Sequence, residues 1–272
     1  MRINDKIMSF EDKINFLKTF SVFDYNEMKD NCTFEYCLHD DALSIFKEKY
    51  NFNKIVDNID EFRDMVKLMI WVNEKLVGDG NCIPPKEFDA DYIIQNSKKG
   101  LRSNCYMYAV VLNEVFLSMG FLSRMVRCMP IDIDFNDCHC VTEVYSNKYK
   151  KWVVFDAANR AYYLNEKMMP LNLFEMRESI INNKRIFVPL MSKTNMHRLV
   201  LYFSKNLIRF ESCKCSKYGN EKNWDNVTII HFQPKNYPVA DKRIYYEEQN
   251  IYINHIHTSN PNIFWAVPDK IV

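Results

Sequence analysis

Three residues in the middle of the chain have the types and the spacing of a cysteine-nucleophile site. Cys105 opens the strongest apolar helical pattern, His139 stands 34 residues later, and Asp156 follows 17 residues after that. His139 and Asp156 each fall in a run of residues that predicts a strand. A thiol at a helix start, an imidazole that deprotonates it and a carboxylate that orients the imidazole are the three parts of an acyl-transfer site.

Two features are expected to lower the pKa of the Cys105 thiol, and only the thiolate attacks carbonyl groups well. The first is the helix N-terminus, where unpaired N–H groups and the helix dipole favour an anion. The second is an imidazolium at His139, which would form a thiolate–imidazolium pair. The first feature follows from the sequence, whereas the second requires His139 to lie close to Cys105 in space.

The two strand runs predict a hairpin that would bring His139 and Asp156 together. If a four-residue loop joins the strands, Tyr145 faces Lys150 and His139 faces Asp156. Directly opposed residues are close enough for a carboxylate to accept a hydrogen bond from an imidazole, and a shift by one residue would separate them. Asp137 is an alternative partner, but adjacent residues of a strand face opposite sides, so Asp156 is preferred.

Taken singly, these residues have ordinary structural interpretations. A lone Cys on a helix is usually a small buried apolar residue, and a lone His in a strand is usually a structural hydrogen-bonding residue. The ordered set, Cys at a helix start and then His and Asp on consecutive strands, favours a catalytic or formerly catalytic site.

A structural zinc site is a weaker alternative. The residues that suggest it are Cys138, His139, Cys140, Cys213, Cys215, His231, His255 and His257. No CxxC pair is present, and strand alternation turns Cys138 and Cys140 away from the face of His139. We therefore expect no metal.

Apolar spacing and turn residues divide the chain into elements that would position the site. The predicted helices cover residues 61–77, 89–97, 104–119 and 165–185, and the predicted strands cover 121–129, 139–145 and 152–156. The helix over 104–119 should be buried on most sides and end at Gly120, which tolerates the left-handed conformation. Pro170 is a candidate for the first turn of the helix over 165–185.

From Leu199 onward the chain is aromatic and β-prone. The runs LVLYF, VTIIHF, RIYY, IYI and IFWAV predict an antiparallel sheet or strands added to a central one. We therefore expect an α+β fold in three regions: a helical N-terminal region (1–60), a catalytic core (61–195) and a β-rich C-terminal extension packed on the core (196–272).

Composition narrows the possible partners and the compartment. The net charge of +1 gives no electrostatic reason to expect nucleic acid or an anionic membrane. The first residues, MRINDKIMSFEDKINF, lack the apolar segment of a secretory signal, and the stretch from Tyr106 to Leu122 is too short and too polar to span a bilayer. The nine cysteines are therefore expected to be reduced in a soluble cytoplasmic protein.

The run from Gly100 to Tyr163 resembles the transglutaminase-like core, a branch of the papain-like cysteine enzymes. The matching segments are a Cys helix ending in Gly (NCYMYAVVLNEVFLSMG), an Arg-Val strand (SRMVRC), a His strand (HCVTEVY) and an Asp strand (KWVVFD). The tail YYLNEKMMPLNLFEMRESI is similar to the segment that follows the core in bacterial members. The resemblance implies a papain-like fold with Cys105 as nucleophile, His139 as general acid/base and Asp156 as its orienting carboxylate.

An acyl-transfer site also needs donors for the oxyanion that forms on the attacked carbonyl. The backbone N–H of Cys105 is expected to be one donor. Trp71 and Asn104 are candidates for the second, although Trp71 also fits a core position. The family usually has Trp or another aromatic residue after the Cys, and Tyr106 keeps that type.

The function expected from these residues is acyl transfer on a peptide or carboxamide through a thioester, which water (hydrolysis or deamidation) or an amine (transamidation) then resolves. No cofactor is expected, the partner is a protein or peptide substrate, and the oligomeric state is not indicated. The alternative is a non-catalytic binding module that retains the fold. Its surface would use the C-terminal aromatic residues Tyr245, Tyr246, Tyr252, Phe264 and Trp265.

Overall fold

A seven-stranded sheet forms the centre of the structure, which is a computed structural model that describes residues 9–28, 32–130, 138–222, 227–238, 253–269 and 271. The strand order is β11-β10-β8-β4-β5-β6-β7, and all neighbours are antiparallel except β10 and β11. The strands are β4 (Ser123–Met129), β5 (His139–Ser146), β6 (Lys151–Asp156), β7 (Ala161–Tyr162), β8 (Arg209–Cys213), β10 (Val227–Phe232) and β11 (Ile253–Thr258).

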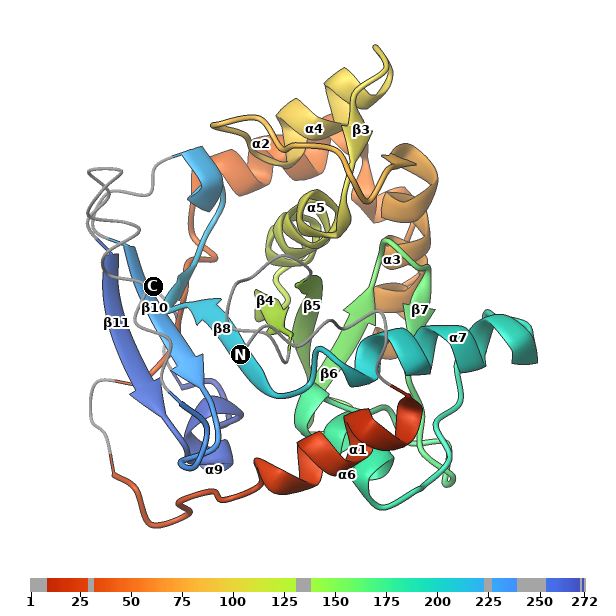
Figure 1. Cartoon of the computed structure of the whole chain (residues 1–272). Helices are drawn as coiled ribbons and strands as arrows, with labels where there is room; N and C mark the ends of the chain where they lie inside the picture. Colours follow the sequence, from red (N-terminus) through yellow and green to blue (C-terminus); the bar gives the residue numbers. More distant parts are fainter. Residues whose placement is uncertain are drawn as a thin grey trace.

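Helices cover both faces of this sheet (Figure 1). One face carries α2 (Asp41–Tyr50), α3 (Glu61–Lys75), α4 (Ala90–Ser97) and α5 (Cys105–Ser118). The other carries α1 (Phe10–Thr19), α6 (Leu173–Ile181), α7 (Lys193–Ser204) and α9 (Pro261–Phe264). Short elements complete the described chain: parallel pairs of β1 (Glu35–Tyr36) with β9 (Cys215–Ser216) and of β2 (Val77–Gly78) with β3 (Arg102–Ser103), and the 3-10 turns η1 (Phe52–Lys54) and η2 (Asn220–Lys222).

Alternation along the strands divides the interior into two cores. In β6, Val153 and Phe155 pack toward α5, whereas Trp152 and Val154 pack toward α1, α6 and α7. All of α5 from Met107 to Ser118 is buried, as its nearly all-apolar sequence predicts. The structure therefore confirms the α+β class, with a central helix packed on a mixed sheet in which all strand pairs except β10 and β11 are antiparallel.

The structure confirms most of the predicted elements and corrects two helix–strand assignments. The run LVLYF is part of α7 and not a strand. Ser192 caps this helix by accepting a hydrogen bond from the N–H of Asn195, and Leu199 and Phe203, four residues apart, share its buried side. In the run IFWAV, Ile263 and Phe264 belong to the short helix α9. A short apolar run does not by itself distinguish a strand from a buried helical face.

The helix predicted over 165–185 is shorter than expected. It begins at Leu173, where Asn172 and Glu175 form a reciprocal capping box. Pro170 lies before it and bridges to Leu164. The RIYY run and most of the IYI run lie outside the described residues. Strands β8, β10 and β11 extend the central sheet, and the boundaries of the three regions stay a prediction.

A buried ion pair on β4 and β5 ties the C-terminal segment to the sheet. Arg124, which is 1% exposed, donates from Nη2 to Glu143 Oε2 at 2.9 Å and from Nη1 to the Phe264 carbonyl oxygen at 2.8 Å. Its guanidinium carbon lies 4.3 Å from the ring centroids of Phe34 and Trp152 and 4.5 Å from that of Phe264. Charge, hydrogen bonds and ring contacts thus hold one buried cation.

Glu143 extends this network to two more elements. Its carboxylate accepts hydrogen bonds from the backbone N–H of Leu173 at 3.1 Å and from Nε1 of Trp265 at 2.8 Å. Trp265 also packs against Phe210 and Phe232. Phe264 and Trp265, which only the alternative of a binding module would place at a surface, therefore contribute to the interior.

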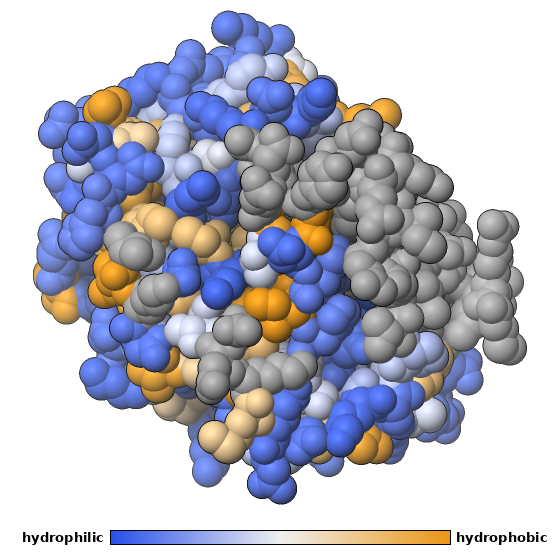
Figure 2. Space-filling model, turned by 90° about the vertical axis from the view of Figure 1, so that its left-hand side faces the viewer, coloured by the Kyte–Doolittle hydropathy of each residue, from blue (hydrophilic) through white to orange (hydrophobic). Residues whose placement is uncertain are grey.

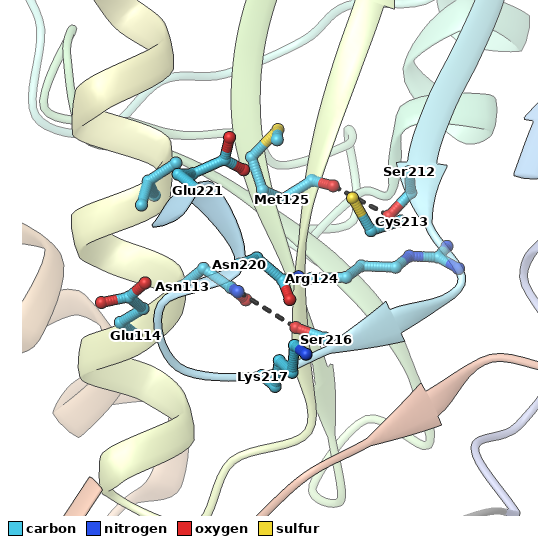
Figure 3. Close-up of a pocket in the computed structure, with 11 residues that line it drawn as sticks. Asn113, Glu114, Arg124, Met125, Ser212, Cys213, Ser216, Lys217, Asn220 and Glu221 are labelled. Atoms are coloured by element: carbon cyan, nitrogen blue, oxygen red, sulfur yellow. Dashed lines mark hydrogen bonds between the residues drawn. The ribbon is translucent and has the colours of Figure 1, made fainter. Parts of the chain in front are cut away.

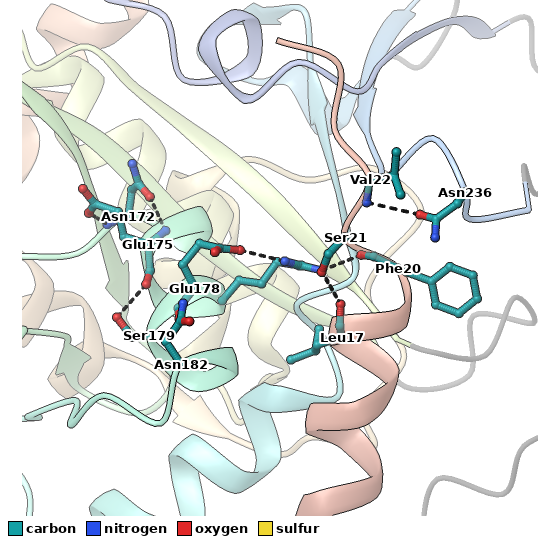
Figure 4. A network of polar contacts seen from close by, with 11 residues as sticks. Leu17, Phe20, Ser21, Val22, Asn172, Glu175, Glu178, Ser179, Asn182 and Asn236 are labelled. Carbon is teal, nitrogen blue, oxygen red and sulfur yellow. Dashed lines mark hydrogen bonds and ion pairs between the residues drawn. The ribbon is translucent and has the colours of Figure 1, made fainter.

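Arg177 joins the end of α1 to α6. Its Nη2 donates to the carbonyl oxygens of Leu17 at 2.6 Å and Phe20 at 2.5 Å and to Ser21 Oγ at 2.9 Å (Figure 4). The last carbonyl groups of a helix lack hydrogen-bond donors within the helix, and the buried guanidinium of Arg177 provides these donors. This contact fixes the N-terminal helix on the side of the sheet that α7 also covers.

The surface shows a mixed character. Among the described residues, none of the helices combines the length and the hydrophobicity of a bilayer-spanning segment. On the face shown in Figure 2, hydrophobic residues lie in small groups between hydrophilic ones.

We expect Glu143→Ala to lower the free energy of unfolding by about 3–5 kcal/mol, because it leaves the Arg124 charge buried and unpaired. Glu74→Ala is the matched control, since Glu74 and Arg160 form an exposed pair at 3.3 Å whose loss should cost about 0–1 kcal/mol. Urea unfolding at neutral pH measures both values. Equal effects of the two substitutions would contradict the role given to Arg124.

Candidate active site

Cys105 is the first residue of α5, as predicted. The preceding Asn104 caps the helix: its Oδ1 accepts from the N–H of Met107 at 3.2 Å, and its Nδ2 donates to the carbonyl oxygen of Cys82 at 3.2 Å. The side chain of Asn104 therefore holds the helix start in place. Cys105 thus stands at the N-terminus of a helix that is buried from Met107 to Ser118, where unpaired N–H groups and the helix dipole favour an anion.

His139 and Asp156 meet in a buried hydrogen-bonded pair. His139 Nε2 lies 2.7 Å from Asp156 Oδ2, and the two residues are 2% and 0% exposed. The carboxylate also accepts from Asn159, through the backbone N–H at 3.1 Å and Nδ2 at 2.8 Å, and from the Tyr163 hydroxyl at 3.3 Å. Four donors thus fix the carboxylate that orients the imidazole.

The pairing of β5 and β6 differs from the predicted register by two residues. Tyr145 faces Trp152 and not Lys150, because the loop residues are 147–150 and Ser146 pairs with Lys151. Lys150 has a positive φ of 54°, a conformation that closes this loop. A shift of two keeps every side chain on its face, so Asp156 reaches His139 as a diagonal neighbour.

Cys105 and His139 line one cleft of about 480 Å³. His139 is the first residue of β5 and Cys105 the first residue of α5, so the helix start approaches the imidazole at the beginning of the strand. Because Asp156 occupies Nε2, Nδ1 is the ring nitrogen that remains for the thiol. The cleft is also lined by Gly78, Asp79, Gly80, Ser103, Asn104, Tyr106, Tyr108, Cys138, Cys140, Ala158, Asn159 and Tyr202.

Helix α7 covers the imidazole from the other side. The rings of Tyr202 and Phe203 meet the His139 ring edge to face, with centroids 5.4 and 5.0 Å away. Sequence analysis missed Tyr202 because its run was assigned to a strand. It also missed Asn159, for which the three-residue spacing after Asp156 is a local signal of a side-chain-to-backbone turn.

The pKa values of the cysteine and the histidine move in opposite directions. A hydrogen bond from Cys140 is the largest effect on Cys105 and lowers its pKa; burial opposes this, and the hydrogen bond and charge of His139 lower the pKa further, to about 4. Burial alone would lower the pKa of His139, but the charge and hydrogen bond of Asp156, together with Cys105, raise it to about 10. Between these values the pair is thiolate and imidazolium.

Cys138 and Cys140 lie closer to the site than sequence analysis expected. Strand alternation does turn them away from the face of His139, but α5 packs on that side of the sheet and brings Cys105 to them. Among the residues that the structure describes, no group of His, Cys, Asp or Glu is arranged to hold a metal ion. Asp137 lies outside the described residues.

The structure separates the two candidates for the second oxyanion donor. Trp71 packs on the rings of Tyr50 and Phe52, with centroids 5.7 and 5.0 Å away, and does not line the cleft. Asn104 lines the cleft, but its side-chain amide is engaged by Met107 and Cys82. The backbone N–H of Cys105 at the helix start therefore remains the candidate oxyanion donor.

Tyr106, the residue after Cys105, is held by the C-terminal segment. Its hydroxyl donates to Glu221, and its ring lies 5.2 Å from the guanidinium of Arg127. The same segment contacts α5 farther along, where Asn113 Nδ2 donates to Ser216 Oγ at 3.0 Å (Figure 3). The residues from β9 to η2 thus brace the helix that carries Cys105.

Comparisons with known proteins agree with this arrangement. Residues 53–157 match the family described as the Transglutaminase-like superfamily, a range that contains Cys105, His139 and Asp156. This part of the chain is thus similar to the transglutaminase-like superfamily, and the structure that contains it is of the α+β class. No curated protein matches the sequence.

Solved structures with low sequence identity also resemble the chain. One is a proposed cysteine protease from Cytophaga hutchinsonii, with 13% identity and a TM-score of 0.35 over 57% of this chain and 45% of that one. Another is LapG of Legionella pneumophila, with 10% identity and a TM-score of 0.33 over 72% of this chain and 96% of that one. The chain thus spans less than half of the Cytophaga protein.

We expect Asp156→Asn to lower the pKa of His139 and raise that of Cys105, because burial then disfavours an imidazolium that no carboxylate compensates. The ultraviolet absorbance of the thiolate, titrated with pH, should show the Cys105 midpoint at a pH higher by at least about 1, or ~1.4 kcal/mol. Asp79→Asn changes an acid that lines the same cleft and should leave the midpoint in place. An unchanged midpoint in Asp156→Asn would contradict the assigned role of the carboxylate.

Proposed function

We propose that the protein is a cysteine-nucleophile enzyme that transfers the acyl group of a peptide or carboxamide substrate. The observation that carries the proposal is the buried His139–Asp156 pair, whose histidine lines the same cleft as Cys105. An ionised thiol, an oriented imidazole and a helix start in one cleft are the parts that this chemistry requires.

The reaction begins with attack of the Cys105 thiolate on the substrate carbonyl carbon. The Cys105 backbone N–H stabilises the oxyanion that forms, as an oxyanion donor does in acyl transfer. His139 then gives a proton to the leaving amine or ammonia, and the collapse of the intermediate leaves a thioester on Cys105. Asp156 keeps the ring in the orientation in which a proton passes at Nδ1.

The thioester is resolved by water or by a second amine. With water, His139 accepts a proton and the outcome is hydrolysis of a peptide bond or deamidation of a carboxamide. With an amine, the outcome is transamidation and an isopeptide or other new amide bond. The substrate in either case is a protein or peptide, and the proposed setting is the reducing cytoplasm, where the thiols stay free.

The non-catalytic alternative receives less support from the described residues. Of the C-terminal aromatic residues expected on its surface, Phe264 is fully buried and Trp265 packs on Glu143 and Phe232. Tyr245, Tyr246 and Tyr252 lie outside the described residues. A binding module has no need of a thiol held below its ordinary pKa, so the ionised Cys105 favours the enzyme.

The pH dependence of the rate of alkylation by iodoacetamide should show that the Cys105 thiol is ionised. We expect its rate to be nearly constant from pH 8 to pH 6, because the thiolate is already formed at both values. Cys82 and Cys213, whose pKa values burial raises, should slow about tenfold per pH unit. Peptide mass mapping after brief labelling measures all thiols in one experiment. A Cys105 rate that falls in parallel with the others would remove the support for the enzyme.

A thioester should accumulate on Cys105 when the protein meets a pool of glutamine-containing peptides and is quenched in acid. Intact mass spectrometry then detects the acyl adduct, and ammonia or a new peptide terminus distinguishes deamidation from cleavage. Cys105→Ala should form no adduct, and His139→Ala should reduce turnover by about 10³-fold or more. Equal turnover in wild type and Cys105→Ala would exclude the proposed nucleophile.

A further inference from the structure

Three thiols meet at the cleft. Cys105, Cys138 and Cys140 all line it, and they form one small cluster with Ala109 and Met125 between α5 and the sheet. The Cys105 sulfur lies 3.9 Å from the carbonyl oxygen of Cys138. All nine cysteines are free thiols in the structure. The proposed reaction uses Cys105 alone, so the two neighbouring thiols have no assigned task.

The packing of α5 on β5 places Cys105 opposite Cys140. The Thr142 hydroxyl donates to the Ala109 carbonyl oxygen at 2.9 Å, which fixes one contact between helix and strand. From Ala109 to Cys105 the helix rises about 6 Å over four residues, and from Thr142 to Cys140 the strand extends about 6.8 Å over two residues. Both steps lead from this contact to Cys105 and Cys140, since residues four apart in a helix and two apart in a strand share a face.

Cys140 forms the link between the other two sulfurs. Cys140 packs in one cluster with Cys105 and Cys138, and hydrogen bonds to these two thiols are the largest effects that raise the pKa of Cys140. Cys140 is 2% exposed, whereas Cys105 and Cys138 are half-buried at the cleft. A small oxidant in the cleft therefore reaches Cys105 more readily than the buried Cys140.

We propose that Cys105 is a site of reversible oxidation by a peroxide and that Cys140 is the thiol that resolves it as a Cys105–Cys140 disulfide. This regulation rests on the proposed function to the extent that it needs Cys105 as a thiolate. The disulfide blocks acyl transfer and protects the nucleophile from irreversible oxidation, and a thiol reductant restores it.

The chemistry proceeds in two balanced steps. The Cys105 thiolate attacks one oxygen of the peroxide, so that an S–O bond forms and the O–O bond breaks. When the oxidant is hydrogen peroxide, the leaving group is hydroxide. Sulfur is oxidised by two electrons to sulfenic acid, and the peroxide is reduced. The Cys140 sulfur then attacks the Cys105 sulfur, so that an S–S bond forms and the S–O bond breaks. The departing hydroxide takes the Cys140 proton and leaves as water.

Oxidation also removes the charge that keeps Cys140 protonated. The hydrogen bond to Cys105 is the largest of the effects that raise the pKa of Cys140. A neutral sulfenic acid at Cys105 no longer supplies a thiolate acceptor. The Cys140 thiol therefore ionises more easily at the step in which its sulfur attacks Cys105.

The test is treatment of the full chain with hydrogen peroxide, followed by peptide mass mapping without reduction. Wild type should give a Cys105–Cys140 disulfide, and dithiothreitol should restore iodoacetamide labelling of Cys105. Cys140→Ser should give no such bond; its Cys105 should form a dimedone adduct and then sulfinic acid, which dithiothreitol does not reverse. Cys138→Ser should still form the Cys105–Cys140 bond.

Cys37→Ser is the matched control. Cys37 and Cys215 form another thiol pair, with sulfurs 3.3 Å apart, and neither lines the cleft, so this variant should behave as wild type at Cys105. A Cys105–Cys138 bond, or sulfinic acid in wild type as fast as in Cys140→Ser, would overturn the proposal. In those cases a flat alkylation profile of Cys105 would leave the proposed function intact, whereas a Cys105 inert to both reagents would defeat both.

Discussion

The site depends on one charge held away from water, the imidazolium of His139 against the Asp156 carboxylate. Because the pKa of His139 is raised, its contribution to stability is fully present below its unfolded value, about 6.5, and is lost as the pH rises through about 10. The pKa of Asp156 is lowered, so its contribution is present above the unfolded value and is lost as the pH falls. The stabilisation by the pair is therefore greatest between the unfolded pKa values of the two groups and declines as the pH rises toward about 10.

The rest of the structure holds that charge in position. The sheet supplies His139 and Asp156 on one face, while α5 brings Cys105 to the beginning of β5. Helix α7 lies outside the matched family range and covers the imidazole with two aromatic rings. The buried Arg124–Glu143 pair then anchors the C-terminal segment against the same strands. Elements from both ends of the chain therefore support a site built from its middle.

Sequence reasoning predicted the three residues of the proposed site because each lies at a recognisable place, a helix start or a strand in a hairpin. Predictions from the sequence were wrong or incomplete where tertiary packing determines the strand register or the position of a side chain. The register of β5 with β6 depends on the backbone of Lys150, and Tyr202 reaches the site only because its run is helical. Strand alternation was applied correctly to Cys140, but its nearness to Cys105 follows from which face α5 covers.

The protonation of the His139 ring near pH 8 tests directly whether the buried pair carries a charge. Nitrogen-15 NMR of the protein with labelled histidine separates imidazolium from neutral imidazole through the shifts of the two ring nitrogens. We expect protons on both nitrogens of His139, together with an ionised Cys105. A neutral His139 at that pH, with a single ring proton, would contradict it.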